Sequence, residues 1–262
     1  MKGLDAWQDA ARHRARRGEI ELVLEGLDAF KPRFARILEI GSGEGFSASY
    51  LSRLGNVFLS DLRAPAKWYS TSKQFVICDA ENLPYPDRAF DLIFSSHVVE
   101  HISNKPKALA EMRRVATDDA IFVHVVPTHF WKLLSVVIYY PDQVLAAFGR
   151  IVKWLGRPEA STPGVQPAVK NSIRLNRFVP PAHGTNVSTW GEFREFHPGE
   201  WKRIFEAAGF SCVRSLPLLA YAPANLPILP ANRRLVRIGL FSSVAYFLRK
   251  SRTGKSDRGQ SR

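Results

Sequence analysis

The sequence predicts an α/β fold in which a mostly parallel sheet carries helices on both faces. In the first half of the 262-residue chain, short runs rich in β-branched and aromatic residues alternate with helical stretches. Such alternation is typical of parallel strands joined by crossover helices. A glycine-rich turn, residues 41–45, joins the first of these strands to the helix that follows it, as in folds that bind a cofactor at the end of a strand.

The expected elements follow one another with short connections. A first helix is expected at residues 5–30 because apolar positions recur there beside a basic cluster. Five strands then alternate with helices. Pro106 fits the first turn of the helix expected at 105–116. The strands are expected at 36–40, 56–60, 74–78, 90–95 and 120–126, the helices at 46–54, 105–116 and 197–208, and a last strand pair within 210–221.

The alternation stops after the fifth strand. The segment that follows is at first apolar and aromatic with interspersed cations, and is then rich in proline, glycine and polar residues. We expect a helical and loop insertion that forms a lid there. The predicted division is an N-terminal helical segment (1–35), a core (36–127), the insertion (128–190), the C-terminal part of the sheet (191–225) and a basic amphipathic segment with a tail (226–262).

The charge of the chain is strongly positive, at +13 from 37 basic and 24 acidic residues. Residues 232–262 hold nine Lys or Arg against Asp257 alone. This surplus indicates an anionic partner, namely a membrane face, nucleic acid or an acidic substrate. Cations interrupt the two most apolar segments, so we expect no spanning helix. Basic amphipathic segments instead make an anionic membrane surface a candidate partner.

Cysteine usage and the N-terminus indicate the compartment. Cys78 and Cys212 are too few for a disulfide framework, and their apolar contexts predict buried thiols in a reducing environment. The N-terminal residues are polar where a secretory signal would be apolar. We therefore expect a cytoplasmic protein, with peripheral attachment to the inner face of the membrane as a further hypothesis.

The most informative motif is the string I-L-E-I-G-S-G-E-G at residues 37–45. Its glycines allow a tight turn against a ligand, and the following helix offers backbone N–H groups to an anion such as a methionyl carboxylate. Asp61 closes the second expected strand and Asp79 follows the third. These carboxylates suit the ribose hydroxyls and the adenine edge of an adenosine cofactor. A nicotinamide-binding turn is disfavoured because its third glycine would come one position later.

Two further strings, D-A-E-N-L-P-Y-P-D-R-A-F-D (79–91) and S-S-H-V-V-E-H (95–101), follow in order. Together the motifs resemble the class I S-adenosylmethionine-dependent methyltransferases, in particular the group of the ubiquinone and menaquinone biosynthesis methyltransferases, across 36–126 and more loosely 197–210. The resemblance implies a Rossmann-like fold with a seven-stranded sheet, and S-adenosylmethionine as cofactor. The cofactor-binding positions it implies are Glu39, Gly41, Ser42, Gly43, Gly45, Asp61, Leu62, Asp79, Ala80, Ser95 and His97.

Histidines raise two further questions. The string from His97 to His101 matches the H-x-x-E-H pattern of some zinc peptidases, but it directly follows a strand, so we expect a structural turn and no metal. His97, His129 and His197 are candidates for a general base that removes the acceptor proton. For each of them, a structural, hydrogen-bonded role is the alternative.

The predicted function is transfer of a methyl group to an O, N or C atom of a small or lipid-linked hydrophobic acceptor. The aromatic insertion and the basic C-terminal segment favour a hydrophobic acceptor. Nucleic acid is not favoured, because the position after the fourth strand reads S-S-H-V rather than Asn/Asp-Pro-Pro-Tyr/Phe. The alternative is a non-catalytic membrane- or nucleic-acid-associated protein that retains the fold. The sequence leaves the oligomeric state open.

Overall fold

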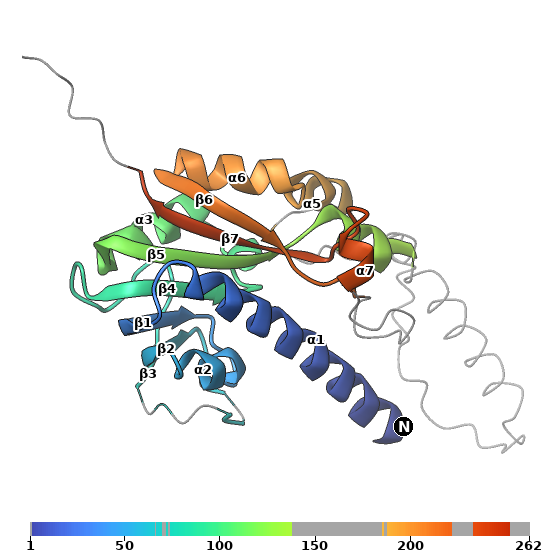
Figure 1. The fold of residues 1–262 in the computed structure, drawn as a ribbon, viewed down its shortest axis with the longest axis horizontal. Coiled ribbons are helices and arrows are strands. Elements are labelled where there is room, and N and C mark those ends of the chain that lie inside the picture. Colours follow the sequence, from blue (N-terminus) through green and yellow to red (C-terminus); the bar gives the residue numbers. More distant parts are fainter. Residues whose placement is uncertain are drawn as a thin grey trace, which may run out of the picture.

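The computed structural model describes residues 2–65, 67–69, 72, 74–137, 185, 188–221 and 233–251. A seven-stranded sheet forms the centre of this part, in the order β3-β2-β1-β4-β5-β7-β6 (Figure 1). The first five strands are parallel, whereas β7 is antiparallel to both of its neighbours. The strands are β1 (Phe34–Ile40), β2 (Gly55–Asp61), β3 (Phe75–Ile77), β4 (Phe90–Ser96), β5 (Ala116–Pro127), β6 (Phe210–Pro217) and β7 (Ser243–Lys250).

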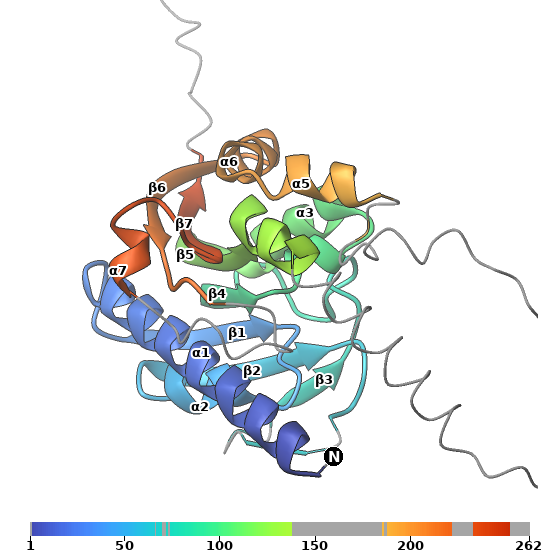
Figure 2. The same cartoon turned by 90° about the vertical axis from the view of Figure 1, so that its right-hand side faces the viewer.

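Helices cover both faces of the sheet, which confirms the predicted fold class (Figure 2). On one face α1 and α2 pack against the strands, and on the other face α3 and α6 do so, each with its own buried apolar cluster. The helices are α1 (Lys2–Asp28), α2 (Phe46–Leu51), the short 3-10 helix η1 (Val99–His101), α3 (Lys105–Val115), α5 (Thr189–Glu195), α6 (Pro198–Ala207) and α7 (Arg233–Val236).

The central strands are buried on both faces because helices cover both sides. Leu92, Ile93 and Phe94 of β4 are at most 1% exposed, and residues 120–126 of β5 are buried as well. This accounts for the continuous apolar runs in the sequence. Burying these side chains contributes the main favourable free energy of folding.

Helix α1 approaches the sheet closely at two glycines that lie on one helical face. A Cβ atom added at Gly18 would lie 2.6 Å from Cδ1 of Leu219, and one added at Gly26 would lie 2.4 Å from Cζ of Phe247. Residues eight positions apart differ by about 80° in direction around an α-helix, so they lie on the same side of it. The two glycines therefore fix the position of α1 along the sheet.

The C-terminal part of the sheet differs from the sequence prediction. Residues 210–217 form one strand rather than a strand pair, and the partner of β6 is β7, which lies between β5 and β6. The prediction of a basic amphipathic segment is therefore wrong for residues 243–250. Six successive β7 residues, 243–248, are buried, as an inner strand requires. The charges that suggest an amphipathic segment lie outside this buried stretch, at Arg237 directly after α7 and at Arg249 near the end of β7.

Much of the predicted insertion lies outside the described residues. Residues 129–137 are helical and continue directly from β5, and the described chain resumes at residues 185 and 188. The prediction of a lid over 128–190 and the division into five segments stay predictions. Among the described helices, none has both the length and the apolar character that crossing a membrane requires.

Candidate functional site

The glycine turn after β1 forms the floor of the candidate site. Gly41, Gly43 and Gly45 have φ angles of +67°, +51° and +75°, in the left-handed region that favours glycine. A Cβ atom at Gly41 would lie 2.3 Å from Cγ2 of Val98, so Gly41 allows tight packing. A Cβ atom at Gly43 would meet no atom within 4 Å. Gly43 therefore borders open space in which a ligand fits.

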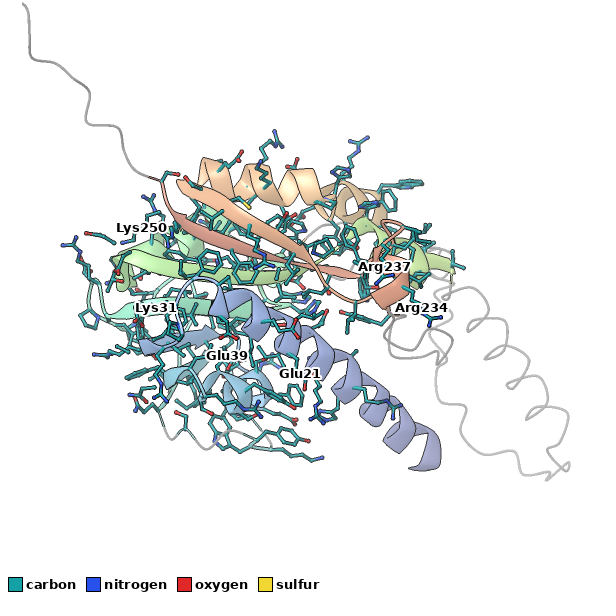
Figure 3. The ribbon with its side chains drawn as sticks, viewed as in Figure 1. Glu21, Lys31, Glu39, Arg234, Arg237 and Lys250 are labelled. Atoms are coloured by element: carbon teal, nitrogen blue, oxygen red, sulfur yellow. The ribbon has the colours of Figure 1, made fainter. Side chains whose placement is uncertain are left out.

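A pocket opens above this turn, and three parts of the chain line it. Helix α1 provides one wall, the glycine turn with the start of α2 provides the second, and the carboxyl ends of β4 and β5 provide the third. Figure 3 shows Glu39 beside α1, the helix that also carries Glu21. The lining residues are Arg16, Glu19, Ile20, Val23, Glu39, Gly41, Ser42, Gly43, Phe46, Ser47, Phe94, Ser96, His97 and Val125.

Glu39 is a buried carboxyl group at the base of this pocket. It is 3% exposed, and its Oε2 atom has no hydrogen-bond partner among the described residues. Burial raises the pKa of Glu39 to about 8, against the opposing effects of Ser47, the backbone of Ala48 and the charge of Arg16. The group is thus largely protonated at neutral pH. An unused buried oxygen of this kind suits a cationic ligand, whose charge would favour ionisation.

Asp61 and Asp79 lie near each other where the neighbouring strands β2 and β3 end, although neither borders the pocket described above. The backbone N–H of Gly43 donates to Oδ2 of Asp61 at 2.8 Å, which joins the end of β2 to the glycine turn. The N–H of Cys78 donates to the carbonyl oxygen of Asp61 at 2.9 Å, which brings Asp79 next to it. Leu62, 66% exposed, extends beyond Asp61 at this edge.

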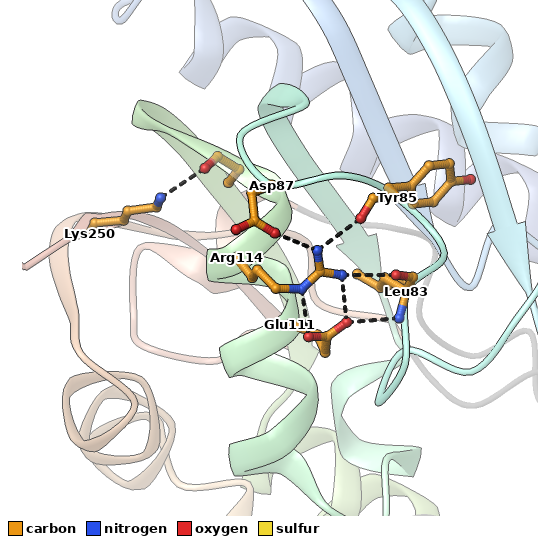
Figure 4. Close-up of polar contacts among 7 residues, drawn as sticks. Leu83, Tyr85, Asp87, Glu111, Arg114 and Lys250 are labelled. Atoms are coloured by element: carbon orange, nitrogen blue, oxygen red, sulfur yellow. Dashed lines mark hydrogen bonds and ion pairs between the residues drawn. The ribbon is translucent and has the colours of Figure 1, made fainter.

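The loop that follows Asp79 and Ala80 is held by Arg114 of α3 (Figure 4). One terminal nitrogen of Arg114 donates to the carbonyl of Tyr85 at 2.9 Å and to Asp87 at 2.8 Å, and the other donates to the carbonyl of Leu83 at 2.9 Å. Glu111 accepts hydrogen bonds from Arg114 and from the N–H of Leu83. This network attaches the loop after Ala80 to α3, which packs on the face of the sheet opposite to α1.

His97 is a half-buried histidine that lies between two buried carboxyl groups. Its Nε2 atom lies 3.3 Å from Oε2 of Glu19 and 3.3 Å from the hydroxyl of Tyr221, and its Nδ1 atom lies 3.6 Å from Oε1 of Glu100. Ser243 in turn hydrogen-bonds to Glu19. Burial opposes the charge on His97, but the two carboxylates outweigh it and raise its pKa to about 10. The raised pKa favours the protonated imidazole, which cannot accept a proton, so these contacts argue against His97 as a general base.

Ser95 does not reach the pocket. Its hydroxyl lies 2.8 Å from Nδ1 of His124, and the His124 ring stacks on Phe205 of α6, on the opposite face of the sheet. Successive residues of a strand point to opposite faces, so Ser96 borders the pocket in place of Ser95. The structure therefore does not place the Ser95 side chain in the pocket where the cofactor is expected.

His129 and His197 stack on each other, with ring centroids 5.2 Å apart, at the carboxyl end of β5 and the start of α6. Neither borders the pocket described above. Nδ1 of His197 accepts the N–H of Gly199 at 3.1 Å, which caps α6 and supports a structural role. Burial, and then the nearby His197, lower the pKa of His129. His129 thus stays neutral and remains a predicted base.

Helix α1 supplies pocket residues that the sequence analysis missed. Arg16, Glu19, Ile20 and Val23 follow the i, i+3, i+4, i+7 pattern and therefore share one helical face. This spacing is visible in the sequence as a stripe, but it does not reveal which surface the stripe contacts.

Comparison with known proteins identifies a family for the part of the chain that contains the glycine turn. Residues 38–124 match the family described as "Methyltransferase domain". The ubiquinone/menaquinone biosynthesis C-methyltransferase of Cupriavidus pinatubonensis is 27% identical over 154 residues, which cover 54% of this chain and 60% of that protein. The mitochondrial arginine-hydroxylase NDUFAF5 of Rattus norvegicus is 31% identical over 96 residues, 34% of this chain and 28% of that protein. The matches thus span less than two thirds of these relatives.

A solved structure resembles nearly the whole chain. The 1,6-didemethyltoxoflavin-N1-methyltransferase of Burkholderia thailandensis, determined with S-adenosylhomocysteine, aligns with a TM-score of 0.52 and 17% identity. The alignment covers 95% of this chain and 83% of that one. At this identity the likeness establishes the fold, and it confirms the predicted Rossmann-like architecture of the class I methyltransferases.

Proposed function

We propose that this chain, which carries a class I methyltransferase domain, transfers the methyl group of S-adenosylmethionine to a small or lipid-linked hydrophobic acceptor. The observation that carries the proposal is the glycine turn, in which Gly43 faces open space while its N–H holds the carboxylate of Asp61. An adenosine-containing cofactor needs this combination of close backbone approach and a ribose-binding acid.

The residues present fit this cofactor. Glu39 has an unused buried oxygen in the pocket, where the positive charge of the cofactor would stabilise its ionised form. The Asp61 carboxylate, held by the N–H groups of Gly43 and Arg63, retains acceptor capacity for ribose hydroxyls. Asp79 and Ala80 would hold the adenine edge, on the loop that Arg114 fixes.

When bound, S-adenosylmethionine supplies a methyl group that its sulfonium already activates, so the chain contributes mainly orientation of the acceptor. The carboxyl ends of β4 and β5 would face that acceptor. His129, which directly follows β5, is a neutral imidazole able to accept a proton from a hydroxyl or amine. His97 cannot act in this way and holds α1 against the site instead.

A hydrophobic acceptor is supported by apolar surface at the same end of the sheet. Leu133 and Val137, on the helical segment after β5, are 46% and 58% exposed, and Trp190 of α5 is 79% exposed. Incubation with methyl-labelled cofactor and a cell extract tests the acceptor class. Label in the lipid-extractable fraction supports a lipid-linked acceptor, and label in the water-soluble pool supports a small polar one.

Calorimetric titration with S-adenosylmethionine tests the cofactor assignment. Asp61→Ala should weaken binding about tenfold or more, because it removes charge-assisted hydrogen bonds worth about 1.5–3 kcal/mol. Asp118→Ala, an exposed aspartate near the start of β5, is the matched control and should bind as the wild type does. Absence of binding by the wild-type protein would overturn the proposed function. Full affinity in Asp61→Ala would overturn only the role of that residue.

The pH dependence of cofactor binding tests Glu39. The free protein holds Glu39 with a pKa of about 8, and the cationic cofactor favours the ionised form. Below pH 8, ionising Glu39 costs free energy, so the dissociation constant should rise up to about tenfold per pH unit as the pH falls toward 7. In Glu39→Gln this part of the pH dependence should disappear. A dissociation constant that stays flat between pH 7 and 9 in the wild type would exclude the coupling.

A further inference from the structure

The end of the sheet that carries the pocket also carries exposed apolar side chains. Leu133 and Val137 lie about one turn apart on the helical segment 129–137 and are 46% and 58% exposed. Trp190 of α5 is 79% exposed, and Ile238, in the turn after α7, is 69% exposed. Large apolar side chains that are exposed close together on a protein mark a contact surface.

Contacts between the three elements hold these side chains at one end of the molecule. The segment 129–137 is joined to α5 by the buried ion pair of Lys132 and Glu192. It is joined to the residues after α7 by the N–H of Thr128, which donates to the carbonyl of Ser242 at 3.0 Å. Figure 2 looks onto this end and shows α5, the helical segment after β5, and α7 in front of the strand ends.

Helix α5 separates its charges between its two sides. Glu192 and Glu195 are largely buried, and each pairs with a lysine of another helical segment, at 2.9 Å for Glu195. Arg194 is exposed and lies about one turn after Trp190, on the same side of the helix. The outer side of α5 therefore presents an apolar ring beside a cation, while its inner acids are neutralised.

The other two parts of this surface have no acids at all in their sequence. Residues 128–137 and 233–242 contain neither Asp nor Glu. Arg234 and Arg237 are exposed, on α7 and in the turn that follows it (Figure 3). A cation thus stands directly before the exposed Ile238. Cations and apolar side chains alternate here without the acids that usually balance them.

The opposite end of the sheet, where the parallel strands begin, has mixed charges. Lys31 pairs with Asp91 at 2.8 Å, and Asp118 pairs with both Arg88 and Lys250. Positive charge next to exposed apolar side chains is therefore a property of the pocket end and does not simply follow from the net charge of the chain.

We propose that the pocket end of the molecule binds the surface of an anionic lipid bilayer. The contact, here called the strand-end surface, consists of Leu133, Val137, Trp190, Ile238, Arg194, Arg234 and Arg237. Its apolar side chains enter the boundary between headgroups and acyl chains, and its arginines face the lipid phosphates. The consequence for catalysis rests on the proposed function: in this orientation a lipid-linked acceptor reaches the pocket without leaving the bilayer.

A second copy of the chain suits this surface less well than a membrane does. A twofold interface brings the same patch of both copies together, so the three arginines of one copy would face those of the other with no acid in the strand-end surface to separate them. Like charges at such distances repel. A nucleic acid would pair with the arginines but would leave the aliphatic side chains exposed to water.

Co-sedimentation of the full-length protein with lipid vesicles tests the proposal. The protein should bind vesicles of phosphatidylcholine and phosphatidylglycerol about tenfold or more tightly than vesicles of phosphatidylcholine alone, because several arginines contribute to the attraction. Added salt should weaken the binding to the anionic vesicles, since it screens these charges.

Two variants with matched controls locate the contact. Trp190→Ala should lower the affinity for anionic vesicles about tenfold, because the indole ring is lost from the membrane interface. Val213→Ala removes an apolar side chain that is 48% exposed on β6 and should leave the affinity unchanged. Arg237→Gln should lower it about fivefold, as expected for one arginine near an anionic surface. Lys202→Gln removes the same charge from α6, where the lysine is exposed, and should change it much less.

The outcomes separate this inference from the proposed function, because vesicle binding is measured without cofactor. Protein that binds S-adenosylmethionine but not anionic vesicles overturns the inference and leaves the function. Protein that binds the vesicles but not the cofactor does the reverse. Equal vesicle affinity of wild type, Trp190→Ala and Arg237→Gln overturns the inference, because another part of the chain then makes the contact. Self-association that Trp190→Ala abolishes, measured by analytical ultracentrifugation without lipid, would assign the surface to a second copy instead.

Discussion

The two faces of the sheet at β4 and β5 bury histidines in opposite ways. On the pocket face, His97 lies between Glu19 and Glu100, and its pKa is raised to about 10. On the opposite face, His124 contacts the hydroxyl of Ser95 and the ring of Phe205, and burial lowers its pKa to about 3. The comparison shows that burial alone keeps a histidine neutral, whereas two carboxylates keep one charged whose side chain is 23% exposed.

The difference also separates a functional surface from a packing surface. The pocket face keeps buried charges and an unpartnered carboxyl oxygen, which cost stability unless they are paired or meet a ligand. The α6 face buries neutral rings, among them Trp201 and Phe205. The α6 side also holds buried atoms without a hydrogen-bond partner, among them Nε2 of His124 and Nδ1 of His129. The pocket face differs in that its unpartnered carboxyl oxygen, on Glu39, borders open space.

The largest expected effect comes from removing the charge on His97. His97→Asn leaves Glu19 and Glu100 buried without their cation, and breaking a buried ion pair in this way costs about 3–5 kcal/mol of stability. Asparagine tolerates the φ of +55° at this position, so the loss reports on charge. Urea unfolding measures it. Adding Glu19→Gln should make the double variant lose less than the sum of the two single variants.

His101→Asn is the control for this experiment, because His101 is exposed and belongs to the same turn. It should change the free energy of unfolding by no more than about 0.5 kcal/mol. A loss of that small size in His97→Asn as well would mean that His97 carries no charge in the folded protein.

Titration should sharpen the contrast between the two histidines. The folded pKa of His97 is about 10 against an ordinary 6.5, so its contribution to stability is complete below pH 6.5 and lost as the pH rises toward 10. The folded pKa of His124 is about 3, so its contribution is lost as the pH falls from 6.5 toward 3. Each slope is at most about 1.4 kcal/mol per pH unit.

Imidazole NMR signals measure these pKa values directly. The resonance that His97→Asn removes should titrate near pH 10, and the resonance of His124 should not titrate above about pH 4. Titration of both near 6.5 would show that the two faces do not differ.

The smallest expected effect lies on the α6 face. Ser95→Ala removes the hydrogen bond to His124 at 2.8 Å and should cost about 1 kcal/mol, without changing cofactor affinity. Ser96→Ala, one residue later, faces the pocket and serves as the comparison. If Ser95→Ala weakens cofactor binding more than Ser96→Ala does, the assignment of the two faces is reversed.

The sequence predicts the cofactor half of the fold well because its signals are local. The glycine turn, Asp61 and Asp79 each follow directly from a strand, and parallel strands bring their carboxyl ends to one edge. The strand bounds there agree within a few residues. The Ser95 side chain faces away from the pocket, whereas the neighbouring Ser96 borders it, because a single step along a strand reverses the direction of the side chain.

The position of β7, the contacts of α1 and the charge of His97 depend on contacts between residues far apart in the sequence, which no local pattern encodes. β7 pairs with strands more than 100 residues and about 30 residues away along the chain, and its flanking arginines resemble those of a surface segment. Arg16 and Glu19 reach the site only because two glycines let α1 approach the sheet. The charge of His97 likewise depends on carboxylates that come from different elements.

The place of β7 between β5 and β6 has a consequence for biosynthesis. Among the described strands, β6 has no other hydrogen-bonded neighbour, so it cannot join the sheet until residues 243–250 have left the ribosome. The early strands can assemble during translation, whereas closure of the sheet must wait for this late segment. A nascent chain interrupted before residue 243 would therefore expose the edge of β5, a surface that chaperones and proteases recognise.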